Sequence, residues 1–524
     1  MDEQIIQQSV QQPAYQSAAA YKPEIKPFDN VFVFLSAIAG FLFIRYSVFT
    51  FNGFFTTASV ILTFICCAVY VIKCGHRPTA SQWTGGAMIC AFAFTYSITS
   101  SPLLHMLCTV FLIAAIFWWV QAVCIKARFV TKFFPSDLLR TMFVQPFIDF
   151  GGAFRSFGAK NNTNGRPSTV KPIIVGLIAT VPLTFIVAAL LASADEGISN
   201  IMDNIWSAFR REDSWKIVCE LLWTVPAGLI FFGMLRADAK QKLYPLPSDM
   251  YYHNKLSACK KVSNLGIYAG VTPICVLYLM YVISQANYFL SAFSGKVPDN
   301  MLYSEYARRG FFELCIIAVI NLGVILFMLT FSKKSGSEST PALKTYTCMI
   351  SGFTLFIIST ALAKMLLYIG KYGLTRLRLY TSWFMVLLAV IFIVLAVRAF
   401  AKRLPTAKII TAAFIVMFGA LCFSRPDALI TEYNIQKYLE GEHEVLDMRM
   451  IESLSDDAYL SALKYVKSGM FEKTDYENHT GYCENIKKMC GRAVDNYENE
   501  PSLAYNFSAQ ELKALYTEYY GTKS

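Results

Sequence analysis

The sequence predicts an all-α, polytopic membrane protein with about 11 transmembrane helices and a small helical extracytoplasmic domain at its C-terminus. Composition is the first observation behind this prediction, because 55% of the 524 residues are hydrophobic and only 16% are charged. The second observation is that the apolar residues gather in stretches of about 20, the length that crosses the hydrocarbon core as a helix. Ordinary soluble folds are therefore excluded.

Eleven apolar stretches have this character, and the third and the last are short, so 10 or 12 spans are the alternatives. The stretches are residues 31–49, 54–72, 83–98, 103–125, 172–191, 215–235, 265–290, 311–331, 346–369, 380–397 and 409–423. They divide the chain into five segments. These are a disordered cytoplasmic tail (1–30), a first four-helix membrane segment (31–125), a basic amphipathic loop (126–171), a seven-helix membrane core (172–424) and an acidic helical domain (425–524).

The basic residues set the expected orientation, because connections rich in Lys and Arg stay in the cytoplasm. The connection 126–171 holds eight basic residues, 236–261 holds six and 398–408 holds four, whereas the alternate connections hold fewer. The N-terminus is therefore expected in the cytoplasm. An odd number of spans then places the C-terminus outside, in a multi-pass protein of the plasma membrane.

The basic loop 126–171 alternates basic and large apolar residues. Such a segment favours the membrane interface, where its aromatic side chains dip into the lipid and its Lys and Arg face anionic head groups. A docking site for a cytoplasmic protein is the alternative.

The C-terminal segment is a separate acidic unit, since it carries 11 basic and 18 acidic residues from Arg425 onward. Its helical spacing and the capping box of Ser508 and Glu511 predict helices, and a protein partner is one possible use of its surface. Cys483 and Cys490 are an even pair outside the cytosol, which is compatible with a disulfide or with two thiols. Seven residues apart on one unbroken helix, the two sulfurs would lie about 10 Å apart, so a bond requires the helix to break.

Three stretches carry a resemblance to a known family: "LLASADEGISNIM", "SEYARRGFFELC" and "RPDALITEYNIQKYLEGEHEVLDMRMIESLSDDAYLSAL". Together they resemble a bacterial family of multi-pass membrane proteins catalogued only as a domain of unknown function. The resemblance covers residues 190–463 and leaves the first four spans outside. It implies a polytopic bacterial protein, and it implies no activity.

Charged residues where the spans begin and end form the candidate site. Glu305, Arg309 and Glu313 are spaced four apart, so opposite charges follow one helix face at the start of the eighth span. Because an unpaired charge in the bilayer is costly, we expect these groups to pair with others at the same depth. The candidate outer-leaflet site comprises Glu220, Glu305, Arg308, Arg309, Glu313 and Lys364, with Asp195, Glu196, Arg376 and Arg378 in the nearby outer connections. Separate anchoring charges at the ends of spans are the alternative.

No catalytic residue can be named, because the chain lacks the GxxxxGK[ST], HExxH, GxSxG and CxxC patterns. The five histidines are scattered, so no metal or cofactor is expected, and nothing indicates a nucleic-acid partner. A non-enzymatic sensor or scaffold fits best. A transporter of a small solute or lipid would combine interrupted helices with polar groups at the midplane, and an enzyme acting on a lipid-linked substrate would use carboxylates at the outer interface.

The basic-loop asymmetry generates a topological prediction. Reporter fusions after Gly75 and after Gly521 should report opposite compartments, the first cytoplasmic and the second outside. Assays of a cytoplasm-active and a periplasm-active reporter at both positions measure this, and the same compartment for both fusions would show that one span is miscounted.

Overall fold

The structure is a computed structural model in which the described residues form helices, with one isolated bridge between Val262 and Ser332. Nine of the described helices are long and apolar enough to cross a membrane. The all-α prediction is therefore confirmed. The described residues are 28–50, 53–126, 130–131, 133–149, 153, 156, 212–239, 249–260, 262–293, 311–332, 341–401, 404–469, 471, 481–499 and 506–521.

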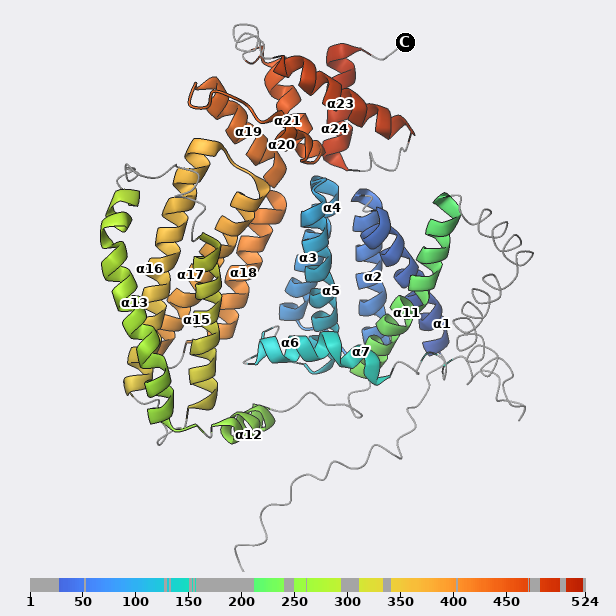
Figure 1. Cartoon of the computed structure of the whole chain (residues 1–524). Coiled ribbons are helices and arrows are strands. Elements are labelled where there is room, and N and C mark those ends of the chain that lie inside the picture. The colour runs from blue at the N-terminus through green and yellow to red at the C-terminus, as the bar shows by residue number, and fades with distance from the viewer. Residues whose placement is uncertain are drawn as a thin grey trace, which may run out of the picture.

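A first helix group packs around the N-terminal spans (Figure 1). Its third expected span is interrupted, because α3 ends at Ala93 and α4 starts at Thr95. The first group consists of α1 (Asp29–Phe43), η1 (Ile44–Thr50), α2 (Gly53–Lys73), α3 (Ala80–Ala93), α4 (Thr95–Ile98), α5 (Pro102–Cys124) and α11 (Glu212–Ala239).

A second helix group has its own apolar core and stands beside the first (Figure 1). Helix α18 (Thr406–Phe423) connects the two groups, because it packs against α17 while its Phe418 ring lies 5.8 Å from that of Phe92 on α3. The second group consists of α13 (Asn264–Phe293), α15 (Phe311–Phe331), α16 (Pro341–Tyr372) and α17 (Arg376–Phe400).

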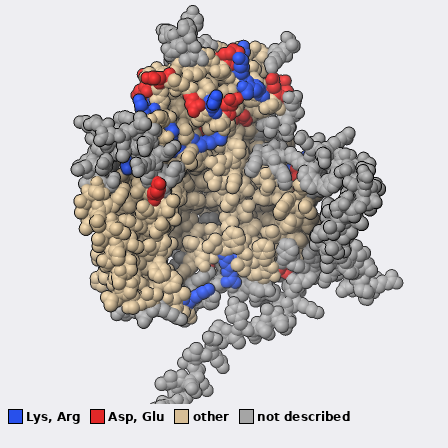
Figure 2. All heavy atoms as spheres, in the orientation of Figure 1, with Lys and Arg blue, Asp and Glu red and all other residues tan. Residues whose placement is uncertain are grey.

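The two ends of the helix groups carry different structures (Figure 1). At one end, which we call the base, lie α6 (Phe134–Phe143), α7 (Gln145–Ile148) and α12 (Asp249–Cys259). The C-terminal domain covers the other end, and on the face in Figure 2 charged side chains gather over it while the sides of the helix groups are mostly uncharged. The C-terminal domain consists of α19 (Pro426–Leu439), α20 (Met448–Glu452), α21 (Asp456–Lys467), α23 (Tyr482–Asn499) and α24 (Phe507–Tyr520).

The packing differs from the expected segments in one respect. Helix α11 was expected in the seven-helix core, yet it packs against α1, α5 and α7. The reason is a close backbone crossing, because a Cβ atom at Gly40 would lie 2.8 Å from the backbone nitrogen of Gly228. Glycine at both positions lets the two helices approach more closely than larger residues would allow. The expected fifth span, residues 172–191, lies outside the described residues, as do most of the tail 1–30 and most of the loop beyond residue 149.

Of the two alternatives for Cys483 and Cys490, the structure shows two thiols and not a disulfide. Cys483 and Cys490 both lie on α23, which runs unbroken from Tyr482 to Asn499, and they are not bonded to each other. The helical rise keeps sulfurs at this spacing about 10 Å apart, beyond the reach of an S–S bond. Cys490 is instead buried in the apolar core of the domain, and this burial raises the pKa of its thiol to about 12.

The close crossing of α1 and α11 predicts that no side chain larger than that of glycine is tolerated at Gly40. Gly40→Ala should lower the free energy of unfolding by about 1–3 kcal/mol, because the added methyl group meets the backbone of α11, which moves only with the whole helix. Thermal unfolding in detergent measures the effect. Gly352→Ala on α16 is the matched control, since nothing lies within 4 Å of a Cβ atom there. Equal losses in the two variants would contradict the crossing.

Candidate functional site

The C-terminal domain meets the helix groups through a polar contact that we call the junction. It joins the loop between α4 and α5 in the first group, the start of α17 in the second group, and three helices of the domain. The junction consists of Thr99, Ser100, Arg376, Arg425, Asp427, Ser455, Asp457 and Ser508.

Asp427 ties the second group to the domain. Its carboxylate is fully buried in the first turn of α19, where it accepts two hydrogen bonds from Arg376, at 2.9 Å from Nε and 2.6 Å from Nη2. The hydroxyl of Ser455 donates to the same carboxylate at 2.6 Å. Two parallel bonds from a guanidinium fix the orientation of the pair as well as its distance.

Asp457 ties the first group to the domain. This fully buried carboxylate accepts hydrogen bonds from the hydroxyl of Thr99 at 2.5 Å and from the backbone N–H of Ser100 at 3.1 Å. Arg425 pairs with it at 3.0 Å, and the hydroxyl of Ser508 on α24 also donates to it. Ser455 lies within 3.5 Å of this carboxylate too, so it links the two aspartates.

The turn from α18 into α19 positions Arg425. Its φ of 51° and ψ of 67° place it in the left-handed region, which is uncommon for a residue other than glycine. Pro426 begins α19 and disfavours the right-handed helical conformation in the residue before it. Such a conformation costs about 1–3 kcal/mol and persists only where surrounding contacts hold it. The ion pair with Asp457 supplies that contact.

The turn between α16 and α17 is held by the domain as well. Asn434 on α19 accepts a hydrogen bond from the N–H of Leu374 and donates one to the carbonyl of the same residue, each at 2.8 Å. A ring nitrogen of His443 lies 2.9 Å from the carbonyl oxygen of Gly370. Arg378 donates to the carbonyl of Tyr372 at 2.9 Å, so its side chain stabilises this turn.

Electrostatically the junction is balanced, with two arginines against two aspartates. A carboxylate buried away from water requires an ion-pair partner and hydrogen bonds, and both aspartates have them. The neighbouring Asp456 differs, because burial raises the pKa of its carboxyl to about 6. Because the pKa of Asp456 is higher in the folded than in the unfolded state, its protonated carboxyl stabilises the folded domain at low pH. This stabilisation is lost as the pH rises through about 6, where the buried carboxyl ionises.

A second polar cluster, which we call the base cluster, lies in the first group at the opposite end. Arg236 is fully buried on α11 and pairs with Asp149 at 3.2 Å, while its Nη1 donates to Ser156 at 3.2 Å. Asp238 is also buried, and Gln121 on α5 donates to it at 3.2 Å when its amide nitrogen faces the carboxylate. The base cluster consists of Asp29, Tyr70, Gln121, Asp149, Ser156, Arg236 and Asp238.

Of these two sets, the sequence indicated only Arg376 as a candidate site residue, and it indicated neither the partners of Arg376 nor the base cluster. In the sequence, Arg236 is one of the basic residues of a connection. The pattern that could have indicated the base cluster is the pair Arg236 and Asp238 in the last turn of an apolar helix. Four junction residues come from the stretch that carries the family resemblance, namely Arg425, Asp427, Ser455 and Asp457. Asn434, which holds the turn between α16 and α17, comes from the same stretch.

The expected outer-leaflet cluster is divided between the two groups. Glu220 is buried on α11 and its carboxylate lies 3.5 Å from Arg45, because α1 and α11 pack together. Lys364 is buried on α16 in the second group, and Glu313 is exposed in the first turn of α15. Of the remaining residues of the expected site, Arg376 pairs with Asp427 in the junction and Arg378 donates to the carbonyl of Tyr372. Glu305, Arg308, Arg309, Asp195 and Glu196 lie outside the described residues. Across the described part of the chain, no group of three metal-ligating side chains is placed to hold a metal ion.

The junction predicts a non-additive mutant cycle. Asp427→Asn should destabilise docking of the domain by about 3–5 kcal/mol, because it leaves the Arg376 guanidinium without its buried carboxylate partner. The double variant Asp427→Asn/Arg376→Gln should lose less than the sum of the two single variants. Pulse proteolysis of the domain in detergent measures the loss.

An exposed ion pair gives the matched control for this cycle. Arg492 lies 2.8 Å from Glu452 on the domain surface, and both side chains are about half exposed or more. Arg492→Gln should change the stability by about 0–1 kcal/mol. Additive losses at the junction, or losses no larger than this control, would show that the Arg376–Asp427 contact does not hold the domain.

Comparison with known proteins places the chain in a family without assigning it an activity. No curated protein and no solved structure matches the chain. Residues 86–465, more than half of the chain, match the family described as "Domain of unknown function (DUF4153)". The match begins inside the third expected span, earlier than the resemblance indicated, and it includes most of the junction. The chain therefore belongs to the DUF4153 family of proteins with a domain of unknown function.

Proposed function

We propose that this protein is a non-enzymatic sensor or scaffold of the bacterial plasma membrane that couples its outer C-terminal domain to its cytoplasmic base. The single observation that carries the proposal is the placement of α5. One end of this helix begins at the junction and the other end reaches the base cluster. A change in the position of the domain would therefore move α5 and alter the contacts at the opposite surface of the membrane.

The contacts at both ends of α5 are specific. Thr99 and Ser100, directly before the helix, bond to Asp457 of the domain. Gln121, near its other end, faces Asp238. The 23 residues between Pro102 and Cys124 extend about 35 Å at 1.5 Å per residue, which is the thickness of a membrane.

The helix is also fixed in register with its neighbour α3. The indole nitrogen of Trp119 donates to the carbonyl of Gln82 at 2.7 Å, and the amide of Gln82 donates to the carbonyl of Ala122 at 2.8 Å. Packed helices of this kind move as rigid elements between discrete arrangements. Because these bonds hold α5 against α3, a displacement at one end of α5 would reach its other end and would not be lost by local bending of the helix.

The base offers a surface that a signal could reach. Helix α6 follows α5 and lies across the base, and it exposes Leu139 and Phe143, with Phe147 on α7 (Figure 1). Exposed apolar residues beside basic ones suit the interface with anionic head groups. The same surface would suit a cytoplasmic protein, and the acidic outer domain would receive the external partner. The basic connections support the orientation.

A transporter finds less support in the described residues. Pro226 and Pro273 lie within continuous helices, so neither creates the broken helix expected of a transport site. A polar contact near the middle of the second group links Asn321 with Tyr278 and Thr354. It is uncharged, and its members bond to one another.

The coupling predicts that a change at the junction alters the base. Asp457→Asn should increase the reactivity of Cys124, which is buried at the base end of α5, about fivefold or more, as a coupling of 1 kcal/mol or more requires. Maleimide labelling of the full chain in membranes, quantified for each cysteine peptide by mass spectrometry, measures this.

Two controls separate coupling from unfolding. Cys275 is buried in the second group, and its labelling should stay unchanged, because unfolding would expose both thiols. Arg492→Gln at the exposed pair should change neither. If Cys124 responds no more than Cys275 in Asp457→Asn, the proposed coupling through α5 is wrong.

A further inference from the structure

Helices α13 and α15 are joined at two levels. At the base, the N–H of Val262 donates to the carbonyl of Phe331 at 3.3 Å, and Ser332 donates to Asn264 at 2.6 Å. Near the middle of both helices, Tyr278 donates to the side-chain oxygen of Asn321 at 2.5 Å. Between these two levels the helices do not fill the space that separates them.

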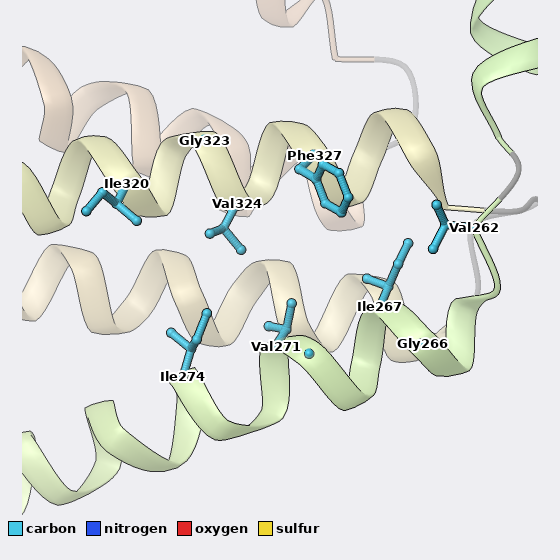
Figure 3. Close-up of a pocket in the computed structure, with 10 residues that line it drawn as sticks. Val262, Gly266, Ile267, Val271, Ile274, Ile320, Gly323, Val324 and Phe327 are labelled. Atoms are coloured by element: carbon cyan, nitrogen blue, oxygen red, sulfur yellow. The ribbon is translucent and has the colours of Figure 1, made fainter.

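The space is an apolar groove of about 560 Å³ (Figure 3). None of the described residues that line it carries a charged or hydrogen-bonding side chain. Three glycines widen it, because a Cβ atom at Gly266, Gly270 or Gly323 would meet nothing within 4 Å. Its remaining lining residues are Val262, Ile267, Val271, Ile274, Ile320, Val324 and Phe327.

The groove has the depth of one leaflet. It lies between the base contacts at Asn264 and the mid-helix contact at Tyr278, a separation of about 21 Å at 1.5 Å per residue. Half of the hydrocarbon core is about 15 Å thick, and the head-group region adds the remainder. A groove that starts at the membrane surface and closes at the midplane matches the path of a lipid chain.

Two basic residues come shortly before Val262, which lines the base end of the groove. Lys260 is two residues before Val262, and Lys255 is exposed on α12, which packs against α15. Figure 2 also shows basic side chains at the base on the face drawn. Lysine near the membrane surface attracts anionic head groups.

We propose that the groove is a binding site for one acyl chain of an anionic phospholipid from the leaflet at the base, with the phosphate near Lys255 and Lys260. The apolar lining, the depth and the basic residues before Val262 each fit this ligand. A helix from a second copy fits less well, because about 21 Å of helix with a diameter of about 10 Å occupies roughly 1,600 Å³, three times the groove. The proposal does not depend on the function proposed above.

Photolabelling tests the site in the full-length protein. The probe is a phosphatidylglycerol with a photoreactive group in its acyl chain, in vesicles that otherwise contain phosphatidylcholine. Irradiation should label peptides of α13 and α15 that line the groove more strongly than the exposed surface of α16. Gly270→Leu should fill the groove and reduce its labelling to the level of that surface.

Matched variants separate the chain site from the head-group site. Gly352→Leu on α16 adds the same side chain at another open glycine and should leave groove labelling unchanged. Lys255→Gln/Lys260→Gln should abolish the preference over a phosphatidylcholine probe of the same chain. Groove labelling no stronger than that of α16, or the same in Gly270→Leu, would overturn the proposal. Rapid disulfide cross-linking of two copies through Gly266→Cys would assign the groove to a second copy instead.

Discussion

Two buried aspartates at the end of the helix groups are the constraint on which the arrangement of the protein depends. A carboxylate taken out of water must be paired and hydrogen-bonded, and neither Asp427 nor Asp457 is satisfied by its own helix. Arg376 comes from the second helix group, and Thr99 comes from the first. Because Ser455 contacts both carboxylates, the domain cannot satisfy one without being positioned for the other. The junction thus sets the domain on both groups at once.

Inside the membrane, packing is controlled by different interactions, since lipid tails are as apolar as the helices themselves. Close approach at Gly40 and Gly228 and hydrogen bonds such as that of Trp119 to Gln82 hold the first group. Polar contacts such as Asn321 with Thr354 hold the second. Helices joined at separated points by hydrogen bonds need not touch between them. The groove between α13 and α15 lies between two such points of contact, and its glycines keep it open.

Helix α5 connects two polar sets, the junction and the base cluster. The junction and the base cluster lie at opposite ends of one helix that spans the membrane, and each buries charge that must remain paired. A shift of α5 along its axis would disturb the bonds of Thr99 and Ser100 to Asp457 at one end and the contact of Gln121 with Asp238 at the other. The same geometry that stabilises the fold thus supports the coupling role that we propose.

The sequence by itself determined the class, the helices and the separation of an acidic domain from basic connections. These features depend on local properties: the length of an apolar stretch, the count of charges in a connection, the spacing along one helix. It also showed why Cys483 and Cys490 cannot bond on an unbroken helix. Only the tertiary structure decided the partners of the charges, because they come from distant parts of the chain. Glu220 meets Arg45 across 175 positions, and Thr99 meets Asp457 across 358. Common depth, with the cost of an unpaired charge in lipid, suggested a single outer cluster. The packing of α1 on α11 instead gave Glu220 the partner Arg45, and nothing local in the sequence encodes that packing.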